Sequence, residues 1–365
     1  MAKIIFATVI GVHGLIHVLG FLKAFGFARL TQLTQTISRP VGITWAVTSG
    51  LFIGVAILFG LKVDWWWIVG LLAVVPSQAL IIGSWQDAKF GTVLNVVILV
   101  GIVLGFGAWN FDRKVSGEIE TVLPGKATGG GKVVAEESID RLPQPVQKWL
   151  RTAGVPGARG ISTVKLSQRG ELRLNPDQSW SSVKAEQYVN TEDPAFIWRV
   201  NMRLFSIIPV AGRDKFADGK GDMEIKIGSL FPVVSGNSNE KLNQAALQRY
   251  LAELGWYPTA ALKPYINWKK VDERTAEATM EYRGTSGSVT FHFTEDYDLE
   301  KISAMRYRDS GEDAKKKEWF GEVRETEVVN GLRIPTEIDI SWVLEDGVFT
   351  WYRFEVTDME FDFTE

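Results

Sequence analysis

Two histidines are the residues of this chain best placed for chemistry, because both lie in a stretch that is otherwise apolar. His13 and His17 are four residues apart, so a helix over this stretch carries both side chains on one face. Imidazoles at this spacing can jointly hold one metal ion, as in helical zinc sites. They cannot bind both faces of one haem, because both come from the same side, so a bis-axial haem would need another subunit.

Other interpretations of this histidine pair stay open. Neutral His13 and His17 can form hydrogen bonds to a neighbouring helix, with Gln78 or Asn95 as the partner. No carboxylate lies near them to complete a metal site, which favours this hydrogen-bonding interpretation. A proton or quinone role is the third possibility, because ionisable residues deep in a membrane are functional candidates by default.

A second group of candidates surrounds a predicted turn in the polar part of the chain. Its members are Arg213, Asp214, Asp218, Lys220 and Asp222. Two carboxylates near a turn suggest Ca²⁺ binding or acid/base chemistry. However, the spacing lacks the ligand pattern of an EF-hand, and no nucleophile–base pair is recognisable. We therefore favour a solvated, salt-bridged hairpin, since surface ion pairs are common and contribute little.

A third group is aromatic. The candidates for lining an apolar, ligand-binding cavity are Tyr250, Trp256, Tyr257, Trp268, Trp319 and Trp342. The alternative is ordinary core packing, because aromatic side chains dominate core energetics in any case.

Composition excludes several classes of function. The chain has 365 residues, a net charge of −3 and no cysteine. Disulfides, thiolate nucleophiles and Cys-ligated metals are therefore excluded, and no general attraction to nucleic acid is indicated. The phosphate-binding, serine-hydrolase and zinc-protease motifs G-x-x-x-x-G-K-[ST], G-x-S-x-G and H-E-x-x-H do not occur. We expect a binding protein rather than an enzyme, with no cofactor.

Four stretches without Lys, Arg, Asp or Glu must position the histidines. They are Ile4–Leu22, Val41–Leu61, Trp65–Gln86 and Phe90–Asn110. Each is close to the roughly 20 residues that a helix needs to cross the hydrocarbon core. Tryptophans at the stretch ends are typical of an interfacial belt. We predict an all-α four-helix membrane bundle over residues 1–112.

The rest of the chain changes character. The glycines and proline of 123–132 predict a flexible tether, and we assign residues 113–137 to a linker. Residues 138–365 alternate between apolar and polar positions, with turns at Asn330-Gly331 and Asp346-Gly347. One amphipathic helix is predicted over Glu240–Leu254, closed by Gly255. The predicted fold is α+β, with a large curved antiparallel sheet and one covering helix.

Charge does not orient the chain in the membrane. Lys3, Lys62, Arg113 and Lys114 flank the spans on one side, and Lys23, Arg29, Arg39 and Lys89 on the other. The positive-inside count is therefore a tie.

Several segments of the chain resemble an uncharacterised bacterial membrane-protein family, classed as a domain of unknown function. The matching segments include H-G-L-I-H-V-L-G-F-L-K-A-F-G (13–26), D-A-K-F-G-T (87–92), A-E-Q-Y (185–188), G-R-D-K-F-A-D-G-K-G-D-M (212–223), R-Y-L-A-E-L-G-W-Y-P-T-A (249–260) and N-G-L-R-I-P-T (330–336). The resemblance covers nearly the whole chain and implies no activity.

The polar domain alone also resembles the lipoprotein-carrier (LolA/LolB-like) fold, whose members hold acyl chains outside the cytoplasm. This resemblance implies that the domain lies on the extracytoplasmic side of a bacterial inner membrane and binds an apolar or lipid-like ligand beside the bilayer. The expected partners are membrane lipids. One alternative function is an accessory subunit of a larger membrane complex, and another is a membrane redox or metal protein that uses His13 and His17.

Overall fold

A computed structural model describes residues 2–31, 33–123, 132–204, 208–236 and 238–363. By their internal contacts these residues divide into two compact units, 1–113 and 114–365. The fold class predicted from the sequence is confirmed in both: long apolar helices form the first unit, and one antiparallel sheet dominates the second.

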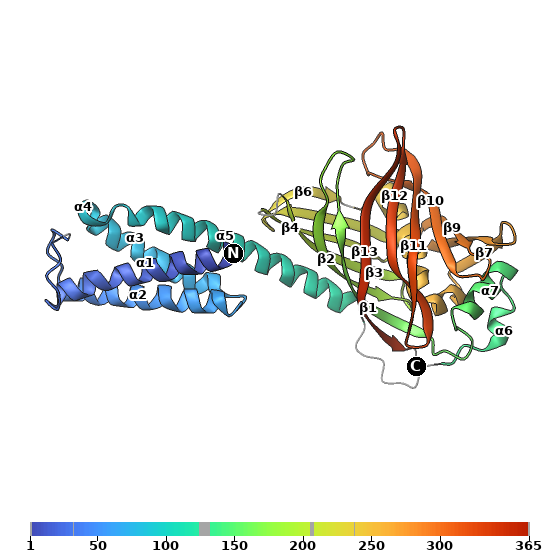
Figure 1. Ribbon diagram of the computed structural model, residues 1–365, viewed down its shortest axis with the longest axis horizontal. Helices are drawn as coiled ribbons and strands as arrows, with labels where there is room; N and C mark the ends of the chain where they lie inside the picture. Colours follow the sequence, from blue (N-terminus) through green and yellow to red (C-terminus); the bar gives the residue numbers. More distant parts are fainter. Residues whose placement is uncertain (1, 32, 124–131, 205–207, 237, 364–365) are drawn as a thin grey trace. The chain divides into compact units, whose positions relative to one another are not determined.

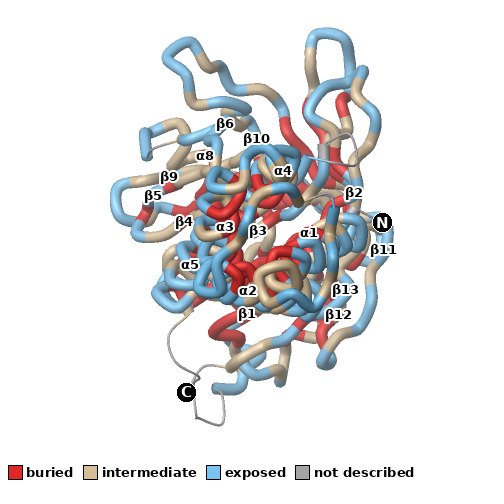
Figure 2. Tube along the Cα trace, turned by 90° about the vertical axis from the view of Figure 1, so that its left-hand side faces the viewer, coloured by how far each residue is buried: buried red, intermediate tan, exposed pale blue. Residues whose placement is uncertain are grey.

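The first unit is a bundle of helices. They are α1 (Ala2–Ala24), α2 (Arg39–Gly60), α3 (Trp66–Gly83), the short α4 (Trp85–Ala88) and α5 (Gly91–Val122). The four longer helices are long and apolar enough to cross a membrane. In Figure 2, the buried residues of this bundle lie in its interior, and the outward faces are exposed although they are largely apolar. Such outward apolar faces are typical of helices in contact with lipid.

Small residues let the first two helices approach closely. A Cβ atom added at Gly14 would lie 2.9 Å from the Cβ atom of Phe52 and 3.3 Å from the carbonyl oxygen of Ser49. Glycine therefore brings the α1 backbone next to α2 at the level of the two histidines, as in small-residue membrane interfaces.

Helix α5 corrects the predicted linker. Residues 113–122 are helical and continue the last apolar stretch without a break, so they are not a flexible tether. Val115 and Val122 are buried, and Glu118 forms an ion pair with Arg213 at 3.0 Å. These contacts stabilise the last turns of α5. The sequence did not indicate this part of the helix, because glycine-rich residues follow it closely. Residues 124–131, which hold the glycines, lie outside the described residues.

The second unit contains one sheet of thirteen strands (Figure 1). They are β1 (Ile161–Leu172), β2 (Ser181–Asn190), β3 (Ala195–Leu204), β4 (Ile208–Ala217), β5 (Lys220–Ile227), β6 (Phe231–Gly236), β7 (Ile266–Lys270), β8 (Thr275–Tyr282), β9 (Thr285–Phe293), β10 (Leu299–Tyr307), β11 (Lys316–Val329), β12 (Leu332–Leu344) and β13 (Gly347–Phe363). The spatial order is β6-β5-β4-β3-β2-β1-β13-β12-β11-β10-β9-β8-β7. Two antiparallel meanders, β1–β6 and β7–β13, are thus joined through the β1–β13 pair.

Helices cover this sheet on its concave face. Helix α8 (Glu240–Ala252) contacts β4 and β5 of one meander and β8, β9 and β10 of the other. It begins where the Asn239 side chain accepts a hydrogen bond from the Leu242 amide. It ends at Ala252, two residues before the predicted end at Leu254, and the chain continues in the 3-10 turns η1 (Glu253–Trp256) and η2 (Pro258–Leu262). Gly255 therefore lies inside a turn rather than closing the helix.

Two short helices precede the sheet. They are α6 (Glu136–Ile139) and α7 (Gln144–Thr152), and α7 contacts β7 and β8. One continuous hydrophobic core joins α7, α8 and both meanders, and Trp149 of α7 packs on Phe291 and Phe293 of β9.

Candidate functional site

The polar candidates of the apolar helices come together in one cluster. His13 Nε2 lies 2.9 Å from Asn95 Oδ1, and His17 Nε2 lies 2.9 Å from Ser77 Oγ. Asn95 in turn donates to Gln78 Oε1 at 3.0 Å. Helices α1, α3 and α5 are therefore tied together through side chains that are mostly buried. Asn95 is a partner that the sequence pointed to, whereas the role of Ser77 was missed.

Aromatic rings pack around the cluster. The His13 and His17 rings meet edge to face at 4.7 Å, and Phe52 packs against both. His17 Nδ1 donates to the His13 carbonyl oxygen at 2.8 Å, which fixes the orientation of this ring. Within the described part of the chain, no group of three or more His, Cys, Asp or Glu side chains could hold a metal ion. The arrangement suits cross-linking of helices by hydrogen bonds.

The charged hairpin is divided between the two faces of the sheet. Arg213 is 2% exposed and pairs with Glu118 and Asp222, whereas its neighbour Asp214 pairs with Arg249 of α8. Asp218 pairs with Arg283 at 2.6 Å, and Lys220 is exposed. Successive strand residues point to opposite faces, so the five residues do not form one site.

A buried charge network links α8 to the concave face. Arg249 Nη1 lies 2.7 Å from Asp214 Oδ2, and Arg249 Nε lies 2.8 Å from Glu253 Oε1. Gln187 of β2 accepts from Arg249 and donates to Glu253. The guanidinium also lies over the rings of Phe196 and Trp198, at 4.9 and 4.8 Å. The guanidinium of Arg249 thus forms ion pairs with two carboxylates, those of Asp214 and Glu253.

Burial changes the proton affinities in this network. It raises the pKa of Glu253 above the ordinary value, against the attraction of Arg249. Burial also lowers the pKa of nearby Arg306 to about 10, which still leaves this residue charged at neutral pH. Arg306 donates to the Ala245 carbonyl oxygen and lies over the Trp319 ring. These contacts hold α8 on the sheet.

The aromatic candidates pack in or against the hydrophobic core. Tyr250, Trp256 and Tyr257 are almost fully buried. Tyr257 Oη donates to the Tyr250 carbonyl oxygen at 2.7 Å, and Trp256 Nε1 donates to the Pro335 carbonyl oxygen at 3.0 Å. Satisfied polar atoms of this kind are typical of core aromatics.

The remaining three aromatic candidates also pack in or against the core. Trp319 and Trp342 face each other across β11 and β12, and Trp268 donates to the Ala261 carbonyl oxygen. None of the six lines the cleft described next. Their assignment to an apolar, ligand-binding cavity stays a prediction.

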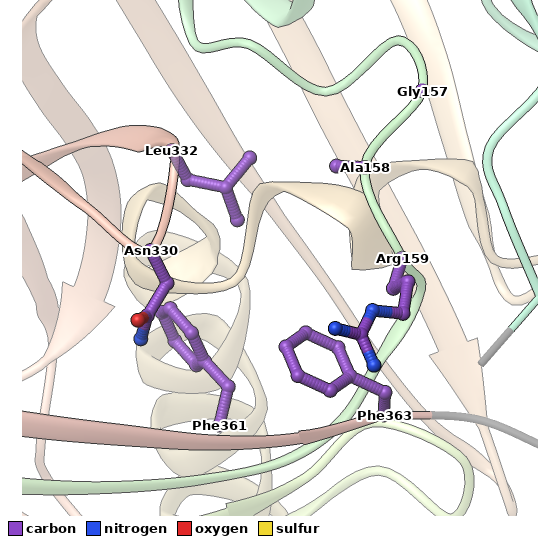
Figure 3. A pocket seen from close by; sticks show the side chains of 7 residues that line it. All are labelled: Gly157, Ala158, Arg159, Asn330, Leu332, Phe361 and Phe363. Atoms are coloured by element: carbon purple, nitrogen blue, oxygen red, sulfur yellow. The ribbon is translucent and has the colours of Figure 1, made fainter. Parts of the chain in front are cut away.

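A cleft of about 410 Å³ opens elsewhere in the second unit (Figure 3). Its lining residues are Gly157, Ala158, Arg159, Asn330, Leu332, Phe361 and Phe363. Figure 3 shows Leu332 and Asn330 on one side, the loop of Gly157, Ala158 and Arg159 on the other, and the two phenylalanines rising from β13 between them.

Local structure fixes the walls of this cleft. Asn330 and Gly331 both have positive φ, 53° and 83°, which form the tight turn between β11 and β12. On the facing wall, Gly157 donates to the Val134 carbonyl oxygen and Arg159 pairs with Val133 in a β-bridge. Both walls are therefore held by main-chain hydrogen bonds.

Arg159 provides the charge of the cleft. Its guanidinium carbon lies 4.6 Å from the centroid of the Phe363 ring, and the side chain is exposed. Among the described residues no carboxylate pairs with it. Leu332 is buried, and Phe361 and Phe363 are half-buried. The cleft thus combines an apolar floor with an available cation at its mouth. Sequence reasoning missed these residues, because only the fold brings residues 157–159, 330–332 and 361–363 together.

Comparison with known proteins is consistent with this architecture. A family model described only as a family of unknown function (DUF6920) matches residues 140–361. No curated protein matches the chain.

Two solved structures are similar to the chain. A DUF1329 family protein from Desulfovibrio piger ATCC 29098 is 10% identical over 62% of this chain and 93% of that chain, with a TM-score of 0.37. A putative outer membrane lipoprotein-sorting protein domain from Vibrio parahaemolyticus is 7% identical over 55% and 85%, with a TM-score of 0.29. The second description agrees with the lipoprotein-carrier resemblance expected from the sequence.

Proposed function

The chain belongs to the DUF6920 family of unknown function, and we propose that it is a membrane-anchored protein whose β domain binds an amphipathic, lipid-like ligand. The observation that carries the proposal is the cleft, where Arg159 lies over Phe363 above an apolar floor. Its volume is within the range of roughly 300–1,000 Å³ typical of small-molecule sites.

The chemistry of the lining indicates the class of ligand. Leu332, Phe361 and Phe363 offer apolar contact to a hydrocarbon segment, which gains about 0.8 kcal/mol for each buried CH₂ group. The Arg159 guanidinium presents several donors to a carboxylate or a phosphate, which it can bind in a bidentate manner. A chain with one anionic end satisfies both requirements.

The apolar helices support the anchor. Four helices of sufficient length and apolarity precede the β domain in one chain, so membrane lipids are the proposed partners and the proposed source of the ligand. We place the β domain on the extracytoplasmic side of a bacterial inner membrane, as the fold resemblance of the sequence implies. A membrane-impermeant maleimide should then label a Val328→Cys variant in intact spheroplasts. Labelling only after lysis would contradict this placement.

A titration of the full-length protein in detergent with a fluorescent fatty acid tests the binding proposal. We expect saturable binding that weakens several-fold in Arg159→Gln, because the exposed ion pair is worth up to about 1 kcal/mol. Phe361→Ala should weaken it further by removing floor area.

The matched control is Arg169→Gln. Arg169 is an exposed arginine on β1, paired with Glu355 at 3.7 Å, and it does not line the cleft. Its loss should leave the affinity for the fatty acid unchanged. Equal effects of the two arginine variants would contradict recognition in the cleft.

A further inference from the structure

The edge of the sheet formed by β6 exposes an unusual run of apolar residues. Phe231 is 67% exposed, Val233 54% and Val234 40%, and Pro232 between them is also exposed. Ile208 at the start of β4 is 40% exposed at the same end of the sheet, where the Gly228 amide donates to the Pro209 carbonyl oxygen. We call Ile208, Phe231, Val233 and Val234 the edge patch.

This edge has no charged protection. Terminal strands are blunted by charged side chains, prolines or bulges, because their free backbone groups invite pairing with other chains. Residues 231–236 of β6 carry no charge, and Pro232 and a bulge opposite Ile225 and Lys226 are the features that interrupt pairing. An exposed apolar patch of this kind marks an interaction surface.

One exposed basic residue lies beside the patch. Arg203 of β3 is exposed and lies opposite Pro209. Lys226 lies opposite Pro232, but it is half-buried and pairs with Glu224 at 3.0 Å. An exposed apolar patch with a basic side chain beside it suits the interface of a bilayer with phosphate headgroups.

The last two turns of α5 run across several strands towards β6. Asn190 of β2 donates to the Val122 carbonyl oxygen, Glu118 pairs with Arg213 of β4, and Lys114 pairs with Glu224 of β5 at 2.7 Å. Going backwards along the chain, the contacts thus move across the sheet from β2 through β4 to β5, the strand next to β6. This order is set entirely within the second unit.

The chain between these contacts and the last apolar stretch is short. Asn110, the last residue of the uncharged stretch, precedes Lys114 by four residues, which is about 6 Å along a helix. Glu224 pairs with Ser235 and Ile227 pairs with Phe231, so the turn into β6 is about 10 Å further along the strand than Glu224. Connectivity alone therefore keeps the edge patch within reach of the membrane surface.

We infer that the edge patch is a membrane-docking surface that inserts its side chains into the interfacial layer of the lipid bilayer. This inference rests on the membrane anchor of the proposed function. It assigns to β6 a role separate from the ligand cleft: burial in the interface covers the unprotected edge and restricts the orientation of the β domain.

Single-cysteine labelling of the full-length protein tests the inference, because the natural chain has no cysteine. Val233→Cys, carrying an environment-sensitive fluorophore, is reconstituted into phosphatidylcholine–phosphatidylglycerol vesicles with or without spin-labelled lipids. Val328→Cys is the matched control, since Val328 is 65% exposed next to the β11–β12 turn. Val97→Cys on α5 reports the anchor.

The expected result is blue-shifted emission and lipid quenching at positions 233 and 97, and neither at position 328. Quenching at 97 without quenching at 233 overturns the docking surface and leaves the anchor intact. Absence of quenching at 97 overturns the anchor itself, and the inference with it. A blue shift at 233 that lipids do not quench and that disappears on dilution in the bilayer indicates pairing with a second copy, and it also overturns lipid docking.

Discussion

At the scale of residues, the polar cluster of the apolar helices depends on Asn95, which forms hydrogen bonds to side chains from two other helices. Asn95 contacts His13, Ser77 and Gln78 at 2.9 to 3.0 Å. Asn95→Leu removes all three hydrogen bonds at similar volume. Interhelical hydrogen bonds in membranes contribute about 0.6 kcal/mol each, so we expect a loss of about 2 kcal/mol.

Unfolding of the full-length protein by sodium dodecyl sulfate measures this loss. Thr44→Val is the control, because the Thr44 hydroxyl donates only to the Pro40 carbonyl oxygen of its own helix. If Asn95→Leu is as stable as the control, the cluster does not hold the bundle together.

Glu253 makes the stability of the β domain depend on pH. Burial raises its pKa above the ordinary 4.5, so the folded protein binds this proton more tightly than the unfolded chain. The free energy of unfolding therefore falls as the pH rises from about 4.5 through the raised pKa. Glu253→Gln has no proton to lose, so its stability relative to wild type should improve over that range.

Tryptophan-monitored unfolding in urea at a series of pH values checks this expectation. Glu322→Gln, at an exposed position of β11 paired with Arg324, serves as the control. A stability difference between Glu253→Gln and wild type that shifts in favour of wild type with rising pH would mean that the attraction of Arg249 outweighs burial.

The sequence allowed some of these residue-level contacts to be predicted and hid others. Two histidines and an asparagine in otherwise uncharged stretches are expected to form hydrogen bonds with other polar groups of the helices, since unpaired polar groups are costly in lipid. Arg159 could not be recognised, because its relation to Phe363 depends on strands about 200 residues apart. For the aromatic candidates the sequence does not distinguish core packing from a cavity lining, because large rings are as suited to a core as to a cavity.

At the scale of elements, helix α8 is seated on β5 through Gly221. A Cβ atom at this position would lie 2.6 Å from the Leu242 carbonyl oxygen and 2.9 Å from Ala246 Cβ. Gly221→Val should push α8 away from the sheet and cost about 1–3 kcal/mol, the usual range for overpacking. Thermal unfolding followed by circular dichroism measures it.

Gly117→Ala provides the matched control for that substitution. A Cβ atom at Gly117 of α5 meets nothing within 4 Å, so alanine should be neutral or stabilise the helix by up to about 1 kcal/mol. Equal stability of the two variants would show that α8 tolerates displacement.

The periodicity of apolar residues predicted most of the helices and strands, whereas only the structure shows which strands pair with one another. Alternation and the Asn330-Gly331 and Asp346-Gly347 turns indicated the β11–β12–β13 hairpins, and these are present. The pairing of β1 with β13 has no local signal, because it joins the two ends of the domain. The linker prediction failed over 113–122 because ion pairs with β4 and β5, not local propensity, stabilise that helix.

At the scale of the whole molecule, the two meanders meet at β1 and β13, and the ligand cleft lies where that pair ends. Phe361 and Phe363 lie at the C-terminal end of β13, and Arg159 lies just before β1. The site therefore exists only when both ends of the domain are paired. Ligand binding should accordingly raise the unfolding temperature of the whole β domain, since a ligand that binds only the folded state stabilises it.

Photo-crosslinking with a diazirine-bearing fatty acid tests the central claim most directly. The full-length protein is irradiated with the probe in detergent, digested and mapped by mass spectrometry. We predict crosslinks to peptides containing Phe361 and residues 157–159, reduced in Arg159→Gln and competed by unlabelled fatty acid. Crosslinks confined to the apolar helices, or to β-domain peptides away from the cleft, would contradict the account.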